Sequence, residues 1–177
     1  MQGGLDSLLT AKGEDQARKM GRLLAAHGVG ATTHDLVSSP QGRAMSTARI
    51  AGSAAGLEPV PDPRLTEITM GKWSGLTREE IDAKWPPPPH ETFIEFYARA
   101  PGGESFDSLW SRTSAFLAGL TRPTVVVTHG FTSRFLRTCA MGLTLADLDA
   151  LPGGQGVVFH LRDGQHRILS NRRLRNP

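Results

Sequence analysis

The chain of 177 residues contains one cysteine, Cys139, and only 6% aromatic residues. A single cysteine excludes an internal disulfide framework and a zinc site built from cysteines. No stretch approaches the roughly 20 apolar residues that span a bilayer. The first residues, MQGGLD, have neither the basic start nor the apolar run of a signal peptide. We therefore expect a soluble, cytoplasmic protein without a membrane partner.

Several catalytic motifs are also missing. The sequence has no Gly-x-Ser-x-Gly elbow of a serine hydrolase, no Walker phosphate loop and no His-x-x-x-His pair. Most of the histidines have no partner at the spacing of metal ligands, and we expect structural or surface roles for His27, His34, His90, His160 and His166. We therefore expect neither a metal ion nor another cofactor.

The positive net charge is concentrated at the C-terminus. The whole chain carries +3, whereas residues 162–177 alone carry +4, from one aspartate, Asp163, and five arginines: Arg162, Arg167, Arg172, Arg173 and Arg175. A nucleic-acid site would instead cover a face of the domain, with aromatic residues among the basic ones. We expect residues 171–177 to form a solvated basic tail, and we expect no nucleic-acid partner.

Length and composition favour one globular domain over residues 1–177. Hydrophobic residues make up 38% of the chain and charged residues 21%, which excludes a disordered protein. Helical periodicity predicts helices from Thr10 to Gly28, from Ser39-Pro40 to about Gly56, from Thr77 to Trp85 and over residues 106–120. Ser39 is expected to cap the second of these helices, with Pro40 at its first position.

Short strands alternate with these helices. Residues 34–38 are expected to be extended. Residues 124–128, TVVVT, are typical of a parallel strand buried on both faces. Residues 156–161 and 166–169 flank an Asp-Gly pair and predict an antiparallel hairpin. The sequence therefore predicts a three-layer α/β/α sandwich, with a mostly parallel sheet, helices on both faces and an antiparallel edge.

Two strand-to-helix junctions have side chains suited to an anionic ligand. In open α/β sheets, ligands bind beyond the carboxyl ends of the strands, where helices begin. The first junction, residues 38–43, ends in Arg43, in the first turn of its helix. A guanidinium beside free backbone N–H groups suits a phosphate. An arginine that merely extends into solvent would give the same pattern, and this alternative stays open.

The second junction is His129-Gly130, directly after the strand at residues 124–128. A histidine at the rim of a sheet can donate to phosphate oxygens or carry a proton, and Gly130 lets a ligand approach the backbone. Glu67 is a third candidate, in a segment rich in glycine and tryptophan. If partial burial kept its carboxyl group protonated, Glu67 could protonate a leaving oxygen. The alternative for Glu67 is an ordinary surface carboxylate.

Several segments together resemble the histidine phosphatase superfamily, the phosphoglycerate-mutase-like proteins. Residues 2–17, QGGLDSLLTAKGEDQA, look like the family's Q-G-x-x-D-x-P-L-T-x-x-G-x-x-Q-A stretch, with Leu8 where proline is usual. Residues 38–48, SSPQGRAMSTA, match S-S-P-x-x-R-A-x-x-T-A. The resemblance continues through residues 65–75, LTEITMGKWSG, 101–105, PGGES, and 126–130, VVTHG.

The resemblance implies a role for each candidate residue. Arg43 and His129 would bind the transferring phosphoryl group, Glu67 would donate a proton to the leaving alcohol, and Gln2 would line the pocket beside Gly130. Residues 73–101 would form a cap-like insertion that faces the substrate. The implied reaction transfers a phosphoryl group from a monoester to a histidine and then to water, without a metal.

The sequence departs from the family in one respect. The family begins with a strand that ends in Arg-His-Gly and supplies the nucleophilic histidine, and the 177 residues contain no such motif. His129 is a poor substitute, because its own motif is that of the family's second histidine. We expect this chain to be truncated, with weak or no turnover. Because the absent strand would be central, we also expect a sheet with exposed backbone edges.

Two alternatives stay open. The chain could be an inactive scaffold or sensor that binds a phosphorylated ligand, or it could be a phosphoglycerate mutase. The expected partner in each case is a small phosphorylated metabolite, and a homodimer is an open alternative to a monomer. The nucleotide sequence upstream of Met1 would separate a truncated enzyme from a scaffold.

Overall fold

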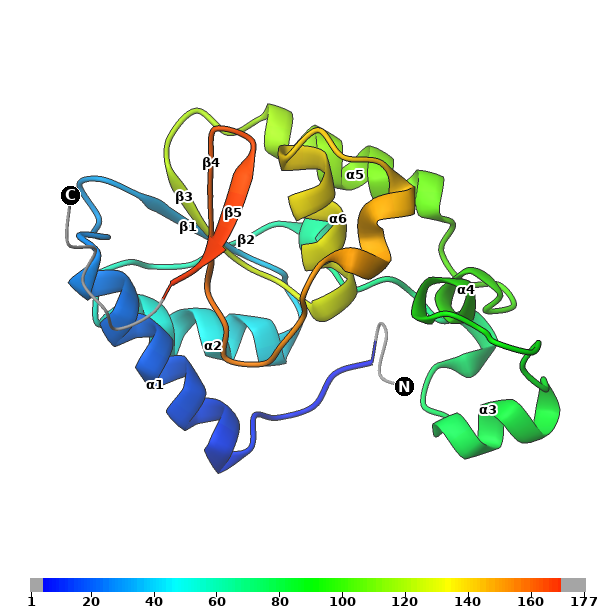
Figure 1. Cartoon of the computed structure of the whole chain (residues 1–177). Helices are drawn as coiled ribbons and strands as arrows, with labels where there is room; N and C mark the ends of the chain where they lie inside the picture. The colour runs from blue at the N-terminus through cyan, green and yellow to red at the C-terminus, as the bar shows by residue number, and fades with distance from the viewer. Residues whose placement is uncertain (1–4, 170–177) are drawn as a thin grey trace.

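The computed structural model describes residues 5–169, and its centre is a three-stranded parallel sheet (Figure 1). Strand β1 (Asp35–Ser38) lies between β2 (Val60–Pro61) and β3 (Thr124–Val127). Val37 of β1 pairs with Val60 on one side and with Val126 on the other. Because all three strands run in the same direction, their carboxyl ends meet at one edge of the sheet, as the alternation of helices and strands predicts.

Helices cover both faces of this sheet. On one face, Leu36 and Val125 pack with Ala48 of α2 (Gly42–Ser53). On the other face, Val37 and Val126 pack with side chains of α5 (Phe106–Ala118) and α6 (Gly130–Ala140). Neighbouring residues of a strand point to opposite faces, so this division of the core confirms the three-layer α/β/α prediction.

Helix α1 (Ala11–Ala26) packs against α2 through small residues. A Cβ atom at Gly21 would lie 2.5 Å from the carbonyl oxygen of Ala51, so the two backbones touch at this point. Ala51 of α2 therefore lies at a helix–helix contact, whereas Ala48 of the same helix packs against the sheet.

Helix α2 begins two residues later than the sequence predicts. Its N-cap is Gln41 rather than Ser39. The carboxylate of Asp6 accepts hydrogen bonds from the backbone N–H groups of Gly42 and Arg43, so a side chain distant in sequence caps the helix. The Ser39 hydroxyl contacts His129 instead. The sequence near the start of α2 does not indicate that Asp6, rather than Ser39, accepts hydrogen bonds from its first N–H groups.

The segment predicted as a cap-like insertion shares a core with two helices of the main domain. It contains the short 3-10 turn η2 (Gly71–Trp73) and the helices α3 (Arg78–Lys84) and α4 (Phe93–Ala98). Both helices begin with capping boxes, and the first, at Thr77 and Glu80, lies where the sequence predicts a helix to begin. Their apolar side chains join α5 and α6 in one cluster: Trp73, Ile81, Phe96, Leu109, Phe131 and Phe135. Figure 1 shows α3 and α4 at the side of the molecule, beyond α5 and α6.

The predicted hairpin consists of β4 (Phe159–Arg162) and β5 (Gln165–Ile168). Its turn residues Asp163 and Gly164 have φ values of 51° and 72°, which suit the two central positions of a type I′ turn. The hairpin forms a sheet of its own in the described part of the chain. The expectation that it forms an antiparallel edge of the main sheet is therefore wrong for residues 5–169.

A large cavity separates β3 from the hairpin. It has a volume of about 1250 Å³ and is lined by all of β3, by residues 157–162 and by parts of α1 and α6. Within residues 5–169, β3 pairs only with β1. All four residues of β3 are half-buried, because the cavity borders this strand. The expectation of a strand buried on both faces is therefore wrong.

Between α6 and the hairpin, the chain forms the 3-10 helix η3 (Leu145–Ala150). No helix in residues 5–169 is both long and apolar enough to cross a membrane.

Candidate active site

Two strand-to-helix junctions meet at the carboxyl edge of the sheet. His129 is the N-cap of α6, and Ser39 follows β1 directly. Nε2 of His129 lies 2.8 Å from the hydroxyl oxygen of Ser39. Arg43, in the first turn of α2, lines the same cavity as His129. The structure therefore brings His129 and Arg43 into one site, although they are 86 positions apart in the chain.

The His129 imidazole is held in its neutral form. Burial lowers its pKa to about 3, and the charges of Arg43 and Arg112 act in the same direction, while Asp6 opposes them. Arg112 is itself fixed by two hydrogen bonds to the carboxylate of Glu104, at 2.7 and 2.8 Å. A neutral imidazole has one N–H donor and one acceptor nitrogen, so His129 can donate to an anion on one side and contact Ser39 on the other.

Glu67 lies at the N-terminal end of α6. Its Oε2 accepts a hydrogen bond from the backbone N–H of Phe131 at 3.2 Å, and its Oε1 accepts one from that of Thr132 at 3.0 Å. The N–H of Ile68 also donates to Oε1, at 3.1 Å. The environment is thus rich in hydrogen-bond donors. Glu67 is half-buried, so the alternative of an ordinary surface carboxylate is wrong.

Gln41 connects Glu67 with the β1–α2 junction. The side-chain oxygen of Gln41 accepts a hydrogen bond of 2.9 Å from the backbone N–H of Glu67. It also lies 3.4 Å from the hydroxyl of Ser39. A chain of polar contacts therefore runs from Glu67 through Gln41 and Ser39 to His129, and holds the candidate acid and the candidate phosphate-binding histidine in one arrangement.

Arg43 faces a carboxylate in this structure. Its guanidinium lies 3.5 Å from Asp6 and also donates to the carbonyl oxygen of Leu5. Hydrogen bonds from the backbone N–H groups of Arg43, Gly42 and Ser7 hold the pKa of Asp6 below its usual value. The Arg43 side chain is only 16% exposed, so the alternative of an arginine extended into solvent is wrong. The positive end of α2 stabilises an anion here, which is the electrostatic environment that the sequence predicts for a phosphate.

Gly130 is the first residue of α6, and its Cα borders open space. A Cβ atom built there would meet no other atom within 4 Å. The large cavity reaches this point, where it is lined by Arg43, Glu67, His129 and Gly130. The fifth predicted site residue, Gln2, lies outside the described residues, as does the predicted basic tail at 171–177.

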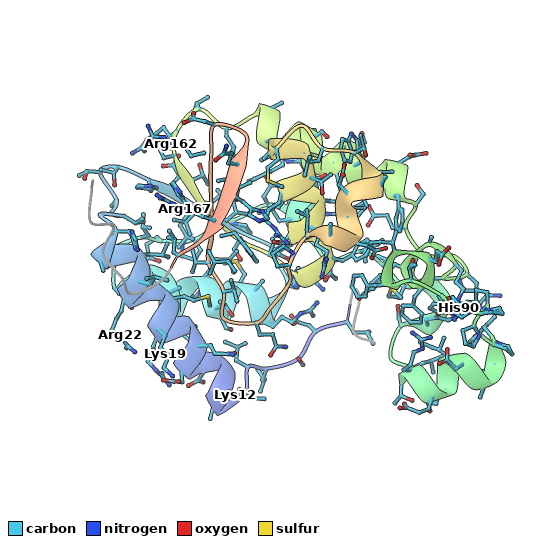
Figure 2. The ribbon with its side chains drawn as sticks, in the orientation of Figure 1. Lys12, Lys19, Arg22, His90, Arg162 and Arg167 are labelled. Carbon is cyan, nitrogen blue, oxygen red and sulfur yellow. The ribbon has the colours of Figure 1, made fainter. Side chains whose placement is uncertain are left out.

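The other histidines lie elsewhere. Figure 2 shows His90 on the outer side of the α3–α4 segment, remote from the sheet. His34 precedes β1, and His27, His34 and His160 of β4 all line the cavity. These three therefore gather near the amino end of β1, opposite the candidate site. Figure 2 also shows Lys12, Lys19 and Arg22 along α1, and Arg162 and Arg167 on the hairpin.

Sequence reasoning missed several residues of the site: Asp6, Ser39, Gln41, Tyr97, Arg112 and Thr132. Ser39 and Gln41 belong to the junction that singled out Arg43, so their position was a usable signal. Thr132 lies three residues after His129, and no local pattern distinguishes it from other helical threonines. In residues 5–169, no group of three His, Cys, Asp or Glu side chains is arranged to hold a metal ion. The site therefore offers a neutral imidazole, a guanidinium and a carboxyl group around a cavity.

Comparison with known proteins agrees with this chemistry. The family model described as "Histidine phosphatase superfamily (branch 1)" matches residues 1–171. The chain is 36% identical over 156 residues to "Probable phosphoglycerate mutase GpmB" of Enterobacter sp. strain 638, which covers 81% of this chain and 67% of that protein. It is 31% identical to "Phosphoserine phosphatase 1" of Hydrogenobacter thermophilus, over 95% of this chain and 82% of that protein.

Solved structures show the same fold. A mycobacterial glucosyl-3-phosphoglycerate phosphatase superposes with a TM-score of 0.73 and 29% identity, covering 95% of this chain and 89% of that one. The α-ribazole phosphatase of Shigella flexneri superposes with a TM-score of 0.75 over 96% of this chain and 87% of that one, at 21% identity. The second likeness concerns the fold alone.

Proposed function

Because the chain belongs to the histidine phosphatase superfamily, we propose that it is part of a phosphomonoesterase for a small phosphorylated metabolite. The observation that carries this proposal is the meeting of Arg43, His129 and Glu67 at one end of the cavity. Arg43 and neutral His129 supply donors for phosphate oxygens. Glu67 supplies the proton for the leaving alcohol.

The proposed reaction has two steps. In the first, the phosphorus–oxygen bond to the alcohol breaks as a histidine nitrogen bonds to phosphorus, and the Glu67 carboxyl group gives its proton to the departing oxygen. In the second, a water oxygen attacks phosphorus and its proton returns to Glu67. The nitrogen–phosphorus bond then breaks and phosphate leaves.

We also propose that the nucleophilic histidine lies on a further strand, which fills the cavity between β3 and β4. Such a strand would pair with the edge of β3 that has no strand partner within residues 5–169, and would join the two sheets. Its carboxyl end would emerge beside His129 and Arg43 if it ran parallel to β3. His27, His34 and His160 also line the cavity, but His34 precedes β1 and so lies at the opposite end of the sheet from His129. We therefore expect the 177 residues alone to bind phosphate but to turn over esters slowly or not at all.

Two other functions each have one supporting observation. The similarity to a protein named "Probable phosphoglycerate mutase GpmB" favours a mutase. The lack of a second histidine at the described site favours a scaffold that binds a phosphorylated ligand. A retained proton donor, Glu67, is more useful to an enzyme than to a scaffold, so we place the phosphatase first.

The experiment that tests the proposal compares the 177-residue chain with the chain extended upstream. Both are assayed for phosphate release from 4-nitrophenyl phosphate, phosphoserine and 3-phosphoglycerate, and for formation of 2-phosphoglycerate. We expect weak or no turnover by the shorter chain and phosphate release by the longer one. Fast turnover by the shorter chain that disappears in His129→Ala would show that His129 is the nucleophile. Isomerisation without phosphate release would establish the mutase.

A further inference from the structure

Ser39 lies between His129 and the segment that carries Glu67. Its hydroxyl oxygen is 2.8 Å from Nε2 of His129 and 3.4 Å from the side-chain oxygen of Gln41. We infer that Ser39 is a positioning residue: its O–H donates to Nε2 and thereby keeps the ring proton of His129 on Nδ1, where a phosphate oxygen can accept it. The inference rests on the proposed function and deepens it, because it names the residue that makes His129 a donor.

The inference concerns which ring nitrogen of His129 carries the proton. A neutral imidazole has one N–H donor and one acceptor nitrogen, and the hydrogen bond at one nitrogen determines the role of the other. With the proton on Nε2, Nδ1 would present a lone pair to an anion and repel it. With the proton on Nδ1, the same nitrogen attracts the anion. The tautomer therefore decides whether neutral His129 binds phosphate through Nδ1.

Nδ1 is the ring nitrogen that is left for a ligand. Within residues 5–169, Nε2 contacts Ser39 and Nδ1 has no hydrogen-bond partner. His129 lines the cavity together with Arg43 and Gly130. Burial and the charge of Arg43 lower the pKa of His129 to about 3, so the ring is neutral near pH 7. A ligand that enters this end of the cavity therefore meets a ring with a single proton.

The contacts of the Ser39 hydroxyl favour donation to His129. The backbone N–H of Gln41 donates to the hydroxyl oxygen at 3.3 Å and so occupies one of its lone pairs. The one hydroxyl proton can then be donated to Nε2 at 2.8 Å or to the Gln41 side-chain oxygen at 3.4 Å. A hydrogen bond between two oxygens is rarely longer than about 3.0 Å. The proton is therefore better placed on the side of His129.

The backbone holds this contact in place. Ser39 directly follows β1, its exposed fraction is 0%, and its N–H donates to the carbonyl oxygen of Val127 at 2.9 Å. Val127 ends β3, two residues before His129. The two strand ends are thus bonded to each other immediately beside the two side chains. A side chain held in this way sets the state of its neighbour before a ligand binds.

NMR of the ring nitrogens in the isotope-labelled chain tests the inference, because a protonated and an unprotonated nitrogen resonate at different positions. The spectrum of His129→Gln identifies the signals of His129. At pH 7 we expect the proton on Nδ1, both in the free chain and with inorganic phosphate. Ser39→Ala should remove this preference, so that both tautomers are populated. In titration calorimetry it should weaken binding of inorganic phosphate about fivefold, as the loss of one hydrogen bond does.

Ser38→Ala is the matched control. Ser38 precedes Ser39, is equally buried, and donates its hydroxyl proton to the carbonyl oxygen of Ser39 at 3.0 Å. Its substitution should change neither the tautomer of His129 nor the affinity for phosphate. Ser39→Thr keeps the hydroxyl group and should keep the proton on Nδ1. Thermal unfolding of each variant checks that it folds.

The outcomes separate the two proposals. A proton on Nε2 of His129 in the wild-type chain would refute the role of Ser39 without any variant. The role is equally refuted if Ser39→Ala leaves the proton on Nδ1 and the phosphate affinity intact. In both cases binding of phosphate by the wild type leaves the proposed function standing. If inorganic phosphate does not bind the wild type at all, the proposed function is refuted, and the role of Ser39 with it.

Discussion

Thr132 contacts a single oxygen of Glu67 twice, through its backbone N–H at 3.0 Å and through its hydroxyl at 2.9 Å. The same hydroxyl lies 2.8 Å from the carbonyl oxygen of Thr66. A hydroxyl group has one proton and cannot donate to both acceptors. Whichever acceptor takes the proton, Thr132 holds the Glu67 carboxyl group beside the first turn of α6.

Thr132→Val tests this positioning role, because valine has nearly the same shape and no hydroxyl. The loss of one hydrogen bond should lower turnover at neutral pH about fivefold. The measurement is kcat against pH in whichever form of the protein turns over esters.

Thr138→Val is the matched control. Thr138 lies in the same helix, is equally buried, and bonds through its hydroxyl to the carbonyl oxygen of Arg134 at 2.8 Å. Its substitution should leave turnover unchanged. Equal turnover by Thr132→Val and the wild type would argue against the proposed positioning role of Thr132.

Glu67→Gln should lower the rate of hydrolysis most for esters whose alcohol is a poor leaving group. A general acid contributes about 10²- to 10⁴-fold to rate, and we expect a loss in this range for phosphoserine. 4-Nitrophenolate leaves without protonation, so the loss for 4-nitrophenyl phosphate should be several-fold at most. Equal losses for both esters would show that Glu67 contributes binding or structure rather than a proton.

Much of this molecule follows from local sequence. The capping box at Thr77, the Asp163-Gly164 turn and the apolar run of β3 each determine their element with neighbouring residues alone. The site was predictable to the same extent, since Arg43 and His129 both follow strands whose carboxyl ends meet at one edge. Contacts between distant segments were not predictable. Asp6 caps a helix that begins 36 residues later, and no pattern in the sequence indicates that these two segments meet.

The environment of a predicted residue was harder to infer than its position. Glu67 was considered as a partly buried carboxyl group, but the sequence did not indicate that Ile68, Phe131 and Thr132 donate to it. The donors arise because Glu67 meets the N-terminal end of α6, which is a tertiary contact. Likewise, β3 is half-buried because of what lies beside the edge that does not pair with β1. The alternation of side chains along a strand carries no information about the neighbours at its edges.

His129 should make the stability of the fold depend on pH. Its pKa is about 3 in the folded chain and near 6.5 when exposed. Between these values the unfolded state binds the proton and the folded state does not, so this contribution to stability is fully present above pH 6.5 and is lost as pH falls. The slope from this one group is at most about 1.4 kcal/mol per pH unit.

Urea denaturation of wild type and His129→Gln at several values between pH 4 and pH 8 measures this slope. Burial also lowers the pKa values of His160 and His166, so only the difference between the two proteins isolates His129. We expect the free energy of unfolding to fall less steeply with acidification in His129→Gln. Parallel curves would place His129 in a more hydrated environment than its contact with Ser39 indicates.

Gly130→Ala tests whether glycine is needed at this position for ligand binding or for the stability of the fold. The added Cβ meets open space, and alanine loses less backbone entropy than glycine on folding, so thermal stability should stay unchanged or rise slightly. The methyl group would project into the space between the start of α6 and the cavity. We expect it to weaken binding of inorganic phosphate about tenfold, which corresponds to about 1.4 kcal/mol.

Gly71→Ala is the opposite case and serves as the comparison. Gly71 has φ near +49°, and a Cβ atom there would lie 2.3 Å from the carbonyl oxygen of Pro101. Its substitution should lower the melting temperature by several degrees, since both strain and overlap act on the folded state. If Gly130→Ala destabilised the chain as Gly71→Ala does, the glycine would be structural. If it left both stability and phosphate affinity intact, the ligand would not approach the backbone at Gly130.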